Sequence, residues 1–237
     1  MLASFVEKIV KLREAKTFEI NGDTYSTDAL HRIAPHIDRP NCLRVAGLNS
    51  VCKLIREELE LLQTTLMVSV DDYNSVSVFT TLLDDLSRDS LYTAKADVPG
   101  FRSGFRVAEE AVIQIRSLFI PNTDTAYLLD LLSRMNKENG VTTQDNGVTQ
   151  TVTARQGIAL NENVTVKPRV SLQPFRTFLE VAQPESEFLL RINEHGNIGL
   201  FEADGGVWKL EAKRNIAAYF ERELKDLVDA GKVVVMF

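Results

Sequence analysis

The chain has few of the residues that would place it in a metal-binding or disulfide-stabilised class. Its two cysteines, Cys42 and Cys52, lie ten positions apart, with no CxxC pair. This count and spacing argue against a disulfide-rich secreted domain and against a zinc site, so we expect two buried, reduced thiols. The three histidines, His31, His36 and His195, form no HxH or HxxxH pattern. We therefore expect neither a bound metal nor a cofactor.

Long hydrophobic runs are also missing. The longest stretch without a charge covers eleven residues, from Tyr73 to Leu83, which is too short to cross a bilayer. Charges interrupt the N-terminal segment MLASFVEKIVKLREAK every few residues, so it lacks the apolar centre of a signal peptide. We expect a cytoplasmic protein without membrane contact.

Positive charge is in deficit, and the common catalytic motifs are absent. The chain has 27 Lys and Arg against 33 Asp and Glu, a formal net charge of −6. That sign repels a phosphate backbone at long range and disfavours nucleic-acid binding. No GxxxxGK[ST], GxGxxG, GxSxG or HExxH pattern occurs, so the usual phosphate loops, nucleophile elbows and zinc helices are excluded. The sequence favours a protein without turnover but leaves enzymatic activity open.

Helical patterns dominate the first 140 residues. Apolar residues spaced near 3.6 predict helices over residues 4–15, 48–62 and 105–119. Thr123 or Asp124 should cap a helix that runs through Met135 and ends at Asn139-Gly140, and Pro35 should end a further short helix that begins after Ser26 or Thr27. Asn21-Gly22 predicts a tight hairpin turn. Alternating polar and apolar residues predict strands over 65–70 and 75–82, and residues 84–104 should be mostly loop.

Strand patterns dominate from residue 141 onward. A Thr- and Val-rich hairpin should turn at Asn146-Gly147, and Pro168 interrupts the next strand, which therefore belongs at a sheet edge or a bulge. A meander is expected over 187–192, 198–203 and 207–212. A helix over 215–230 should then stop at Gly231, before the apolar terminal strand VVVMF.

This order of elements predicts an α+β fold. A helix-rich part with small hairpins, residues 1–140, precedes an antiparallel β-rich part with a C-terminal helix and strand, residues 141–237; the two can also form one single domain. An unpaired apolar terminal strand would be an aggregation hazard. Either a second subunit covers it, which favours a homo-oligomer, or it pairs within its own sheet.

Four arginines are candidate ligand-binding residues. Arg102 lies in the segment Gly100–Gly104, before a predicted helix start whose free N–H groups suit an anion. Arg106 follows four residues later, and the two arginines are expected on one face of the first turn of that helix. Arg169 and Arg176 flank the strand that Pro168 interrupts, and a guanidinium group matches phosphate oxygens. A wider set adds Arg155 and Lys167. The alternative interpretation is that these side chains only solubilise the surface.

Two further segments carry candidate chemistry. Gln173-Pro174 and Gln183-Pro184 predict turns whose phenylalanines either enter the core or line a ligand pocket with Arg176 and Arg191 as anchors. Glu202 and Asp204 lie close together before Gly205-Gly206. Paired carboxylates suit acid–base catalysis or magnesium, but Asp before Gly-Gly is also ordinary hairpin chemistry. Trp208 is expected to be a buried anchor.

Three phrases carry a family resemblance, namely DNGVTQ, QPFRTFLEVAQPESEFLLR and LFEADGGVWKLEA. With the N-terminal hairpin, they resemble the YfdQ-like family of uncharacterised phage and prophage proteins, most strongly over residues 141–237. The resemblance implies a phage accessory protein inside an infected bacterium, with no assigned activity or site.

The sequence therefore predicts a non-enzymatic phage accessory protein, oligomeric, that binds a host factor or a small anionic ligand. One alternative is an anti-defence sponge that sequesters a nucleotide signal. The others are a hydrolase with an acidic centre and an accessory of DNA metabolism.

Overall fold

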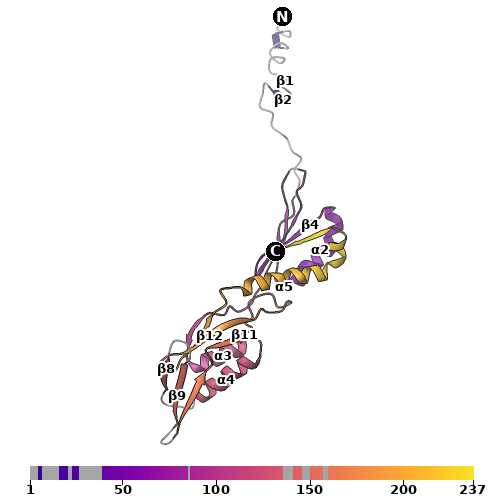
Figure 1. The fold of residues 1–237 in the computed structure, drawn as a ribbon. Helices are drawn as coiled ribbons and strands as arrows, with labels where there is room; N and C mark the ends of the chain where they lie inside the picture. The colour runs from indigo at the N-terminus through magenta and orange to yellow at the C-terminus, as the bar shows by residue number, and fades with distance from the viewer. Residues whose placement is uncertain are drawn as a thin grey trace. The chain divides into compact units, whose positions relative to one another are not determined.

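A computed structural model describes residues 5–6, 16–20, 23–26, 39–84, 86–135, 141–145, 150–156 and 160–237 (Figure 1). The chain divides into a unit Met1–Arg39 and a unit Pro40–Phe237. In the first unit, β1 (Thr17–Ile20) and β2 (Asp23–Ser26) pair antiparallel, which confirms the predicted hairpin. The Asn21-Gly22 turn, most of the helix expected over 4–15 and the helix expected before Pro35 lie outside the described residues.

A five-stranded mixed sheet forms the first half of the larger unit. Its order is β14-β4-β5-β6-β3, with antiparallel pairs at β4–β5 and β5–β6 and parallel pairs at both edges. The bounds are β3 Leu43–Val45, β4 Leu66–Asp72, β5 Ser75–Thr80, β6 Ser90–Lys95 and β14 Val233–Met236. Strands β4 and β5 confirm the two predicted strands.

The loop expected over 84–104 is wrong in part, because β6 lies within it. Leu91, Tyr92 and Ala94 are buried in β6. The strand is short and lies between turn residues, so its apolar residues did not stand out as a strand pattern in the sequence. The terminal apolar strand β14 pairs in parallel with β4, so that Val233 lies opposite Leu66. The terminal strand therefore pairs within its own sheet, which is one of the two interpretations that the sequence left open.

Helices α2 (Leu48–Leu62) and α5 (Trp208–Glu223) pack against each other and against this sheet, and α6 (Lys225–Asp229) follows α5. They share one hydrophobic core with the sheet, in which Ile55, Leu66, Val78 and Phe220 are almost fully buried. The bounds of α2 match the predicted helix. Gly231 follows α6 with φ 69°, a left-handed conformation that suits glycine and confirms the predicted stop.

The strand expected over 207–212 is wrong, because Val207 caps α5 and residues 208–212 form its start. Gly205 and Gly206 do adopt positive φ, at 64° and 83°, but the turn leads into a helix instead of a second hairpin strand. Trp208 and Ala212, four residues apart, are both buried, which is the spacing of one helical face.

A second, antiparallel sheet has the order β11-β12-β13-β7. The bounds are β7 Gly104–Arg106, β11 Arg169–Leu172, β12 Ser186–Ile192 and β13 Ile198–Glu202. Helices α3 (Ala108–Leu118) and α4 (Thr123–Met135) share a second core with it (Figure 1). Helix α4 confirms the helix predicted to run from Thr123 or Asp124 through Met135, whose expected end at Asn139-Gly140 lies outside the described residues. Strand β11 follows Pro168 at a sheet edge, as predicted. The helix expected from Phe105 begins only at Ala108, since residues 104–106 pair with β13.

A third sheet contains β8 (Val141–Asp145), β9 (Gln150–Gln156) and β10 (Leu160–Val166), all antiparallel. It confirms the predicted Thr- and Val-rich hairpin, whose turn lies outside the described residues. The fold class is α+β, as predicted. Because β14 pairs with β4 and β7 pairs with β13, the expected boundary near residue 140 lies within the unit Pro40–Phe237. Among the described residues, no helix has the length and apolar character to span a bilayer.

Candidate functional site

The loop between β11 and β12 is organised by a buried amide. The Gln183 Oε1 atom accepts hydrogen bonds from the backbone N–H groups of Arg176 and Thr177, at 3.0 and 3.1 Å, and its Nε2 donates to the Phe178 carbonyl at 2.9 Å. These bonds satisfy backbone groups that have no ladder partner. The first Gln-Pro segment is fixed separately, because the Phe175 N–H donates to the Leu118 carbonyl at 2.8 Å.

The same loop is anchored to the first core. Phe178 is only 1% exposed and belongs to that core, which confirms the core interpretation for this phenylalanine. Two residues later, the Glu180 carboxylate accepts a hydrogen bond from the Leu48 N–H at 2.8 Å, at the start of α2. A carboxylate here satisfies a free N–H group and complements the helix dipole. The loop therefore holds Arg176 in a fixed frame.

Arg176 lies at the centre of a polar cluster. Its side chain is 5% exposed; Nη1 donates to Glu202 Oε1 at 3.0 Å, and Nη2 donates to the Ser186 hydroxyl and, at 3.3 Å, to the Pro184 carbonyl. The guanidinium carbon lies 3.8 Å from the centroid of the Trp208 ring, a cation–π contact. The surface-solubiliser interpretation is therefore wrong for Arg176.

Charge around this guanidinium is already balanced. Desolvation by burial lowers the pKa of Arg176, and the carboxylates of Glu202 and Asp204 oppose that shift. Arg176 thus stays a cation whose two main counterions are part of the protein, as a buried charge requires.

Asp204 connects this cluster to the start of α5. Its Oδ2 atom accepts a hydrogen bond from the Ser186 hydroxyl at 2.7 Å, and its Oδ1 accepts one from the Gly206 N–H at 3.0 Å. Burial acts to raise the pKa of Asp204, but these bonds, the Trp208 backbone N–H and the charge of Arg176 together hold it below its usual value. Asp204 is therefore ionised near neutral pH and is unsuited to donate a proton.

A cavity of about 160 Å³ opens beside this cluster. Its walls combine aromatic, small and polar side chains: Tyr73, Asn74, Ala96, Val98, Gly100, Phe101, Arg176, Glu202 and Trp208. We call it the Arg176–Trp208 cavity. The Tyr73 ring meets the Trp208 ring edge to face, with centroids 4.8 Å apart.

Two buried N–H groups, which belong to side chains that line the cavity, have no hydrogen-bond partner in the described part of the chain. They are Nε of Arg176 and Nε1 of Trp208, on side chains that are 5% and 6% exposed. Leaving a buried donor unpaired costs roughly 1–3 kcal/mol, and most such groups in folded proteins find a partner. Because both side chains line one cavity, this cavity is the candidate binding site.

The other three predicted arginines do not line this cavity. Arg102 is exposed in a loop, and the Arg106 Nε donates to Gln114 Oε1 at 3.0 Å. The expectation that Arg102 and Arg106 share the first turn of a helix is wrong, because Arg106 ends β7. Arg169 is exposed on β11 and pairs with Glu187 at 2.9 Å. Of the wider set, Lys167 pairs with Asp124 at 3.0 Å.

The acidic pair and the tryptophan, considered separately in the sequence, meet at Arg176. Sequence reasoning missed Tyr73 and Ser186, and it singled out the segment Gly100–Gly104 for its arginine, whereas Gly100 and Phe101 line the cavity. No local pattern marks these residues as neighbours of Arg176. In the described residues, no group of three or more His, Cys, Asp and Glu side chains is placed to hold a metal ion.

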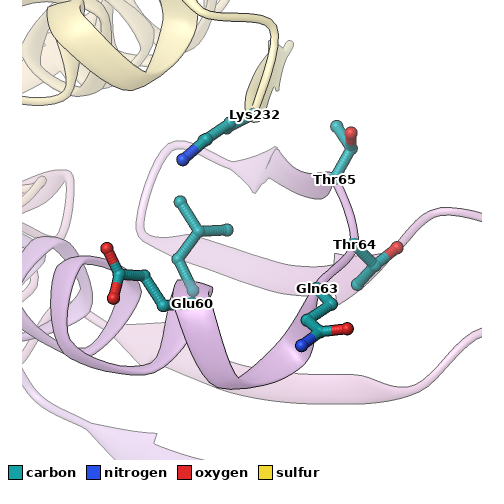
Figure 2. Close-up of a pocket in the computed structure, with 6 residues that line it drawn as sticks. Glu60, Gln63, Thr64, Thr65 and Lys232 are labelled. Carbon is teal, nitrogen blue, oxygen red and sulfur yellow. The ribbon is translucent and has the colours of Figure 1, made fainter.

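A larger hollow of about 530 Å³ lies at the C-terminal end of α2. It is lined by Leu59, Glu60, Gln63, Thr64, Thr65 and Lys232. Figure 2 shows Lys232 approaching from the C-terminal segment, opposite Glu60 and Gln63. Among the described residues that line this hollow, no buried side-chain N or O atom lacks a hydrogen-bond partner. Nothing in its lining therefore points to a ligand as the two unpaired groups of Arg176 and Trp208 do.

Comparisons with known proteins add no assignment to this geometry. A scan against family models, a search of curated proteins and a search of solved structures each find no match. The Arg176–Trp208 cavity is thus what bears most directly on function.

Proposed function

We propose that this protein is a non-enzymatic binding protein that holds a small, hydrogen-bond-accepting ligand, anions included, in the Arg176–Trp208 cavity. One observation carries the proposal: Arg176 and Trp208 line one cavity, and each has a buried N–H group without a partner in the described part of the chain. A ligand acceptor that reached either group from the cavity would remove the cost of leaving that group unpaired.

The two carboxylates beside the cavity are already paired with protein groups, which supports ligand binding without catalysis. Asp204 is held ionised by its hydrogen bonds, and Glu202 is committed to Arg176. A catalytic acid requires a carboxyl group whose pKa is raised toward neutrality, which is the opposite of the shift at Asp204.

The proposed setting is the cytoplasm of a phage-infected bacterium, where the protein would bind a host factor or sequester a nucleotide signal of host defence. The resemblance of segments such as LFEADGGVWKLEA to YfdQ-like proteins supports this setting. The same segment contains Glu202, Asp204 and Trp208, so the likeness coincides with the proposed site.

Self-association is part of the proposal. Strand β14 lies at one edge of the five-stranded sheet, and Val234 and Phe237 are exposed there. An exposed apolar edge is a ready partner for a second copy. Light scattering at micromolar concentration should give a mass above that of one chain, and a monomer mass would refute this part.

Ligand binding is tested by native mass spectrometry of the full chain, purified from cells without denaturation. We expect a small molecule to co-purify with the parent and to be lost or reduced in Trp208→Phe, which removes one donor but keeps an aromatic ring. Arg102→Lys is the control, because Arg102 is exposed and does not line the cavity. Calorimetry with phosphate, acetate and cyclic nucleotides complements this experiment. An empty parent protein that gives no heat with any of them would contradict the proposal.

A further inference from the structure

Strand β14 lies at one edge of the five-stranded sheet, and part of this edge is uncovered. Val233 is only 1% exposed, whereas Val234 and Phe237 are 42% and 61% exposed and Val235 is half-buried. The uncovered part of the edge therefore runs from Val234 to Phe237. An open sheet edge of this kind fits one further extended strand.

The ladder with β4 determines which backbone groups face the open side. The Lys232 carbonyl accepts a hydrogen bond from the Leu66 N–H at 3.0 Å. Along a strand in a parallel ladder, successive residues turn their backbone groups alternately to the two sides. Val234 thus bonds to β4, and Val235 turns its N–H and C=O groups to the open side, where no other described strand pairs with β14.

Charge distinguishes β14 from every other edge strand of the described sheets. Edge strands are commonly protected against pairing with another chain by charged residues, proline or a bulge. Strand β14 has the sequence VVVM, without a charge or a proline. The other edge strands each contain a charged residue, namely Glu19 in β1, Asp23 in β2, Arg44 in β3, Arg106 in β7, Asp145 in β8, Glu162 in β10 and Arg169 in β11. The usual protection is therefore missing at β14.

The composition of the uncovered stretch favours a second copy of the same chain as the added strand. In a twofold antiparallel pair, a stretch meets itself, so any charge in it would lie near the same charge of the other copy. Residues 234–237 contribute only valine, methionine and phenylalanine, side chains that pack well across strands. At β3, the opposite edge of the sheet, the same arrangement would bring Arg44 close to its own counterpart. An acidic or basic peptide finds no counter-charge between residues 234 and 237.

We infer that β14 pairs antiparallel with β14 of a second copy, with Val235 opposite Val235 of the second copy. In this register each Val235 N–H donates to the Val235 C=O of the other copy, and the two sheets become one continuous sheet. The inference rests on the proposed self-association and names the surface that performs it. Because a twofold contact uses the same surface on both copies, the assembly closes at a dimer.

Light scattering of the full chain over a dilution series measures this dimer. A short edge contact belongs to the small, transient class of interfaces. We therefore expect twice the mass of one chain at high protein concentration and a fall toward one chain on dilution.

Charge exchange at Val234 tests whether this edge is the interface. Val234→Lys and Val234→Glu each place like charges near each other across the twofold axis, and each should weaken the dimer about tenfold or more. An equimolar mixture of the two variants should regain the dimer, because opposite charges then meet. Leu43→Lys is the control, since Leu43 is 49% exposed on β3 at the other edge of the same sheet. It should dimerise as the parent does.

A backbone variant tests the hydrogen bonds across the edge. Val235→Pro removes an N–H group that faces the open side, and proline is tolerated at such a position of an edge strand. It should also weaken the dimer, with the fold checked by circular dichroism. If Val235→Pro fails to fold, the mixture of the two Val234 variants carries the test.

The outcomes separate this inference from the proposed function. A parent dimer that neither Val234 variant weakens overturns β14 as the interface, while self-association stands. Variants that become monomers and do not recover on mixing, or a parent larger than a dimer, also overturn the twofold pairing. A parent that stays a monomer refutes self-association and this interface together. If that monomer instead co-purifies with another protein that Val234→Lys releases, the edge belongs to that protein. Retention of a co-purifying small molecule in native mass spectrometry reports on the Arg176–Trp208 cavity separately and should be the same in Val234→Lys and the parent.

Discussion

Two arginine–carboxylate clusters in the unit Pro40–Phe237 differ mainly in their access to water. Arg56 on α2 forms a two-pronged pair with Asp226, at 2.9 and 2.8 Å, and also donates to the Glu223 carbonyl. The Arg56 and Asp226 side chains are 44% and 63% exposed. Arg176 also pairs with a carboxylate, at 3.0 Å, but is only 5% exposed.

This difference in exposure decides what each cluster does. Water and salt screen the exposed pair, which links α2 to α6 but contributes little to stability. In the buried cluster every unpaired group carries a desolvation cost, so the two unpartnered donors stand out. Similar side chains therefore form a surface link in one place and a candidate binding site in the other.

The largest expected effect is at Arg176. Arg176→Ala should lower the free energy of unfolding by about 3 kcal/mol, the lower end for breaking a buried ion pair, because Glu202 retains partial access to water. Urea unfolding followed by circular dichroism measures the change. Arg169→Ala, at an exposed ion pair, is the control and should unfold close to the parent. Equal stability of the two variants would show that Arg176 does not form a buried ion pair with Glu202.

A smaller, pH-dependent effect is expected at Asp204. Asp204→Asn should lower the free energy of unfolding at pH 7 by about 1 kcal/mol, since the ionised acceptor of the Ser186 and Gly206 hydrogen bonds is lost. The folded-state pKa of Asp204 is lowered. Its stabilising contribution is therefore complete above the unfolded value of about 3.9 and is lost as pH falls through the folded value.

Unfolding curves from pH 7 to pH 2 check this sign. The gap between the parent and Asp204→Asn should narrow only below about pH 4. A gap that widens on acidification would mean that the folded-state pKa of Asp204 is raised, contrary to the structure.

The exposed cluster should show the smallest change in stability. Arg56→Ala should shift the urea midpoint by less than replicate measurements differ, because both charges remain solvated after the pair is broken. Any shift should shrink further at high salt. A loss comparable to that of Arg176→Ala would remove the contrast between the clusters.

The two cysteines show the same contrast between an exposed and a buried side chain, and here the measured effect is chemical reactivity instead of stability. Cys42 is exposed, which corrects the expectation of two buried thiols, whereas Cys52 is buried and free. Burial is the main cause that raises the pKa of Cys52 to about 12, so the reactive thiolate is scarce. Iodoacetamide at pH 8 should modify Cys42 in the folded protein and spare Cys52, as read by peptide mass spectrometry. Modification of both at equal rates would contradict this burial.

Local patterns in the sequence determined much of the secondary structure. The helices over 48–62 and 123–135, the hairpins and the stop at Gly231 follow from spacing and turn residues, because side chains three or four apart share a helix face and glycine tolerates positive φ. These features depend on neighbours along the chain, which is why they could be predicted.

The tertiary structure alone decided the partners of these elements and the composition of the site. Gly205-Gly206 fits a hairpin turn as well as a helix start, and only packing of the α5 face against the sheet selects the helix. The sequence named Arg176, Glu202, Asp204 and Trp208 one by one, for different reasons. Burial and cavities arise from contacts between distant segments, so only the folded chain could bring these four side chains together and leave two of their N–H groups unpaired.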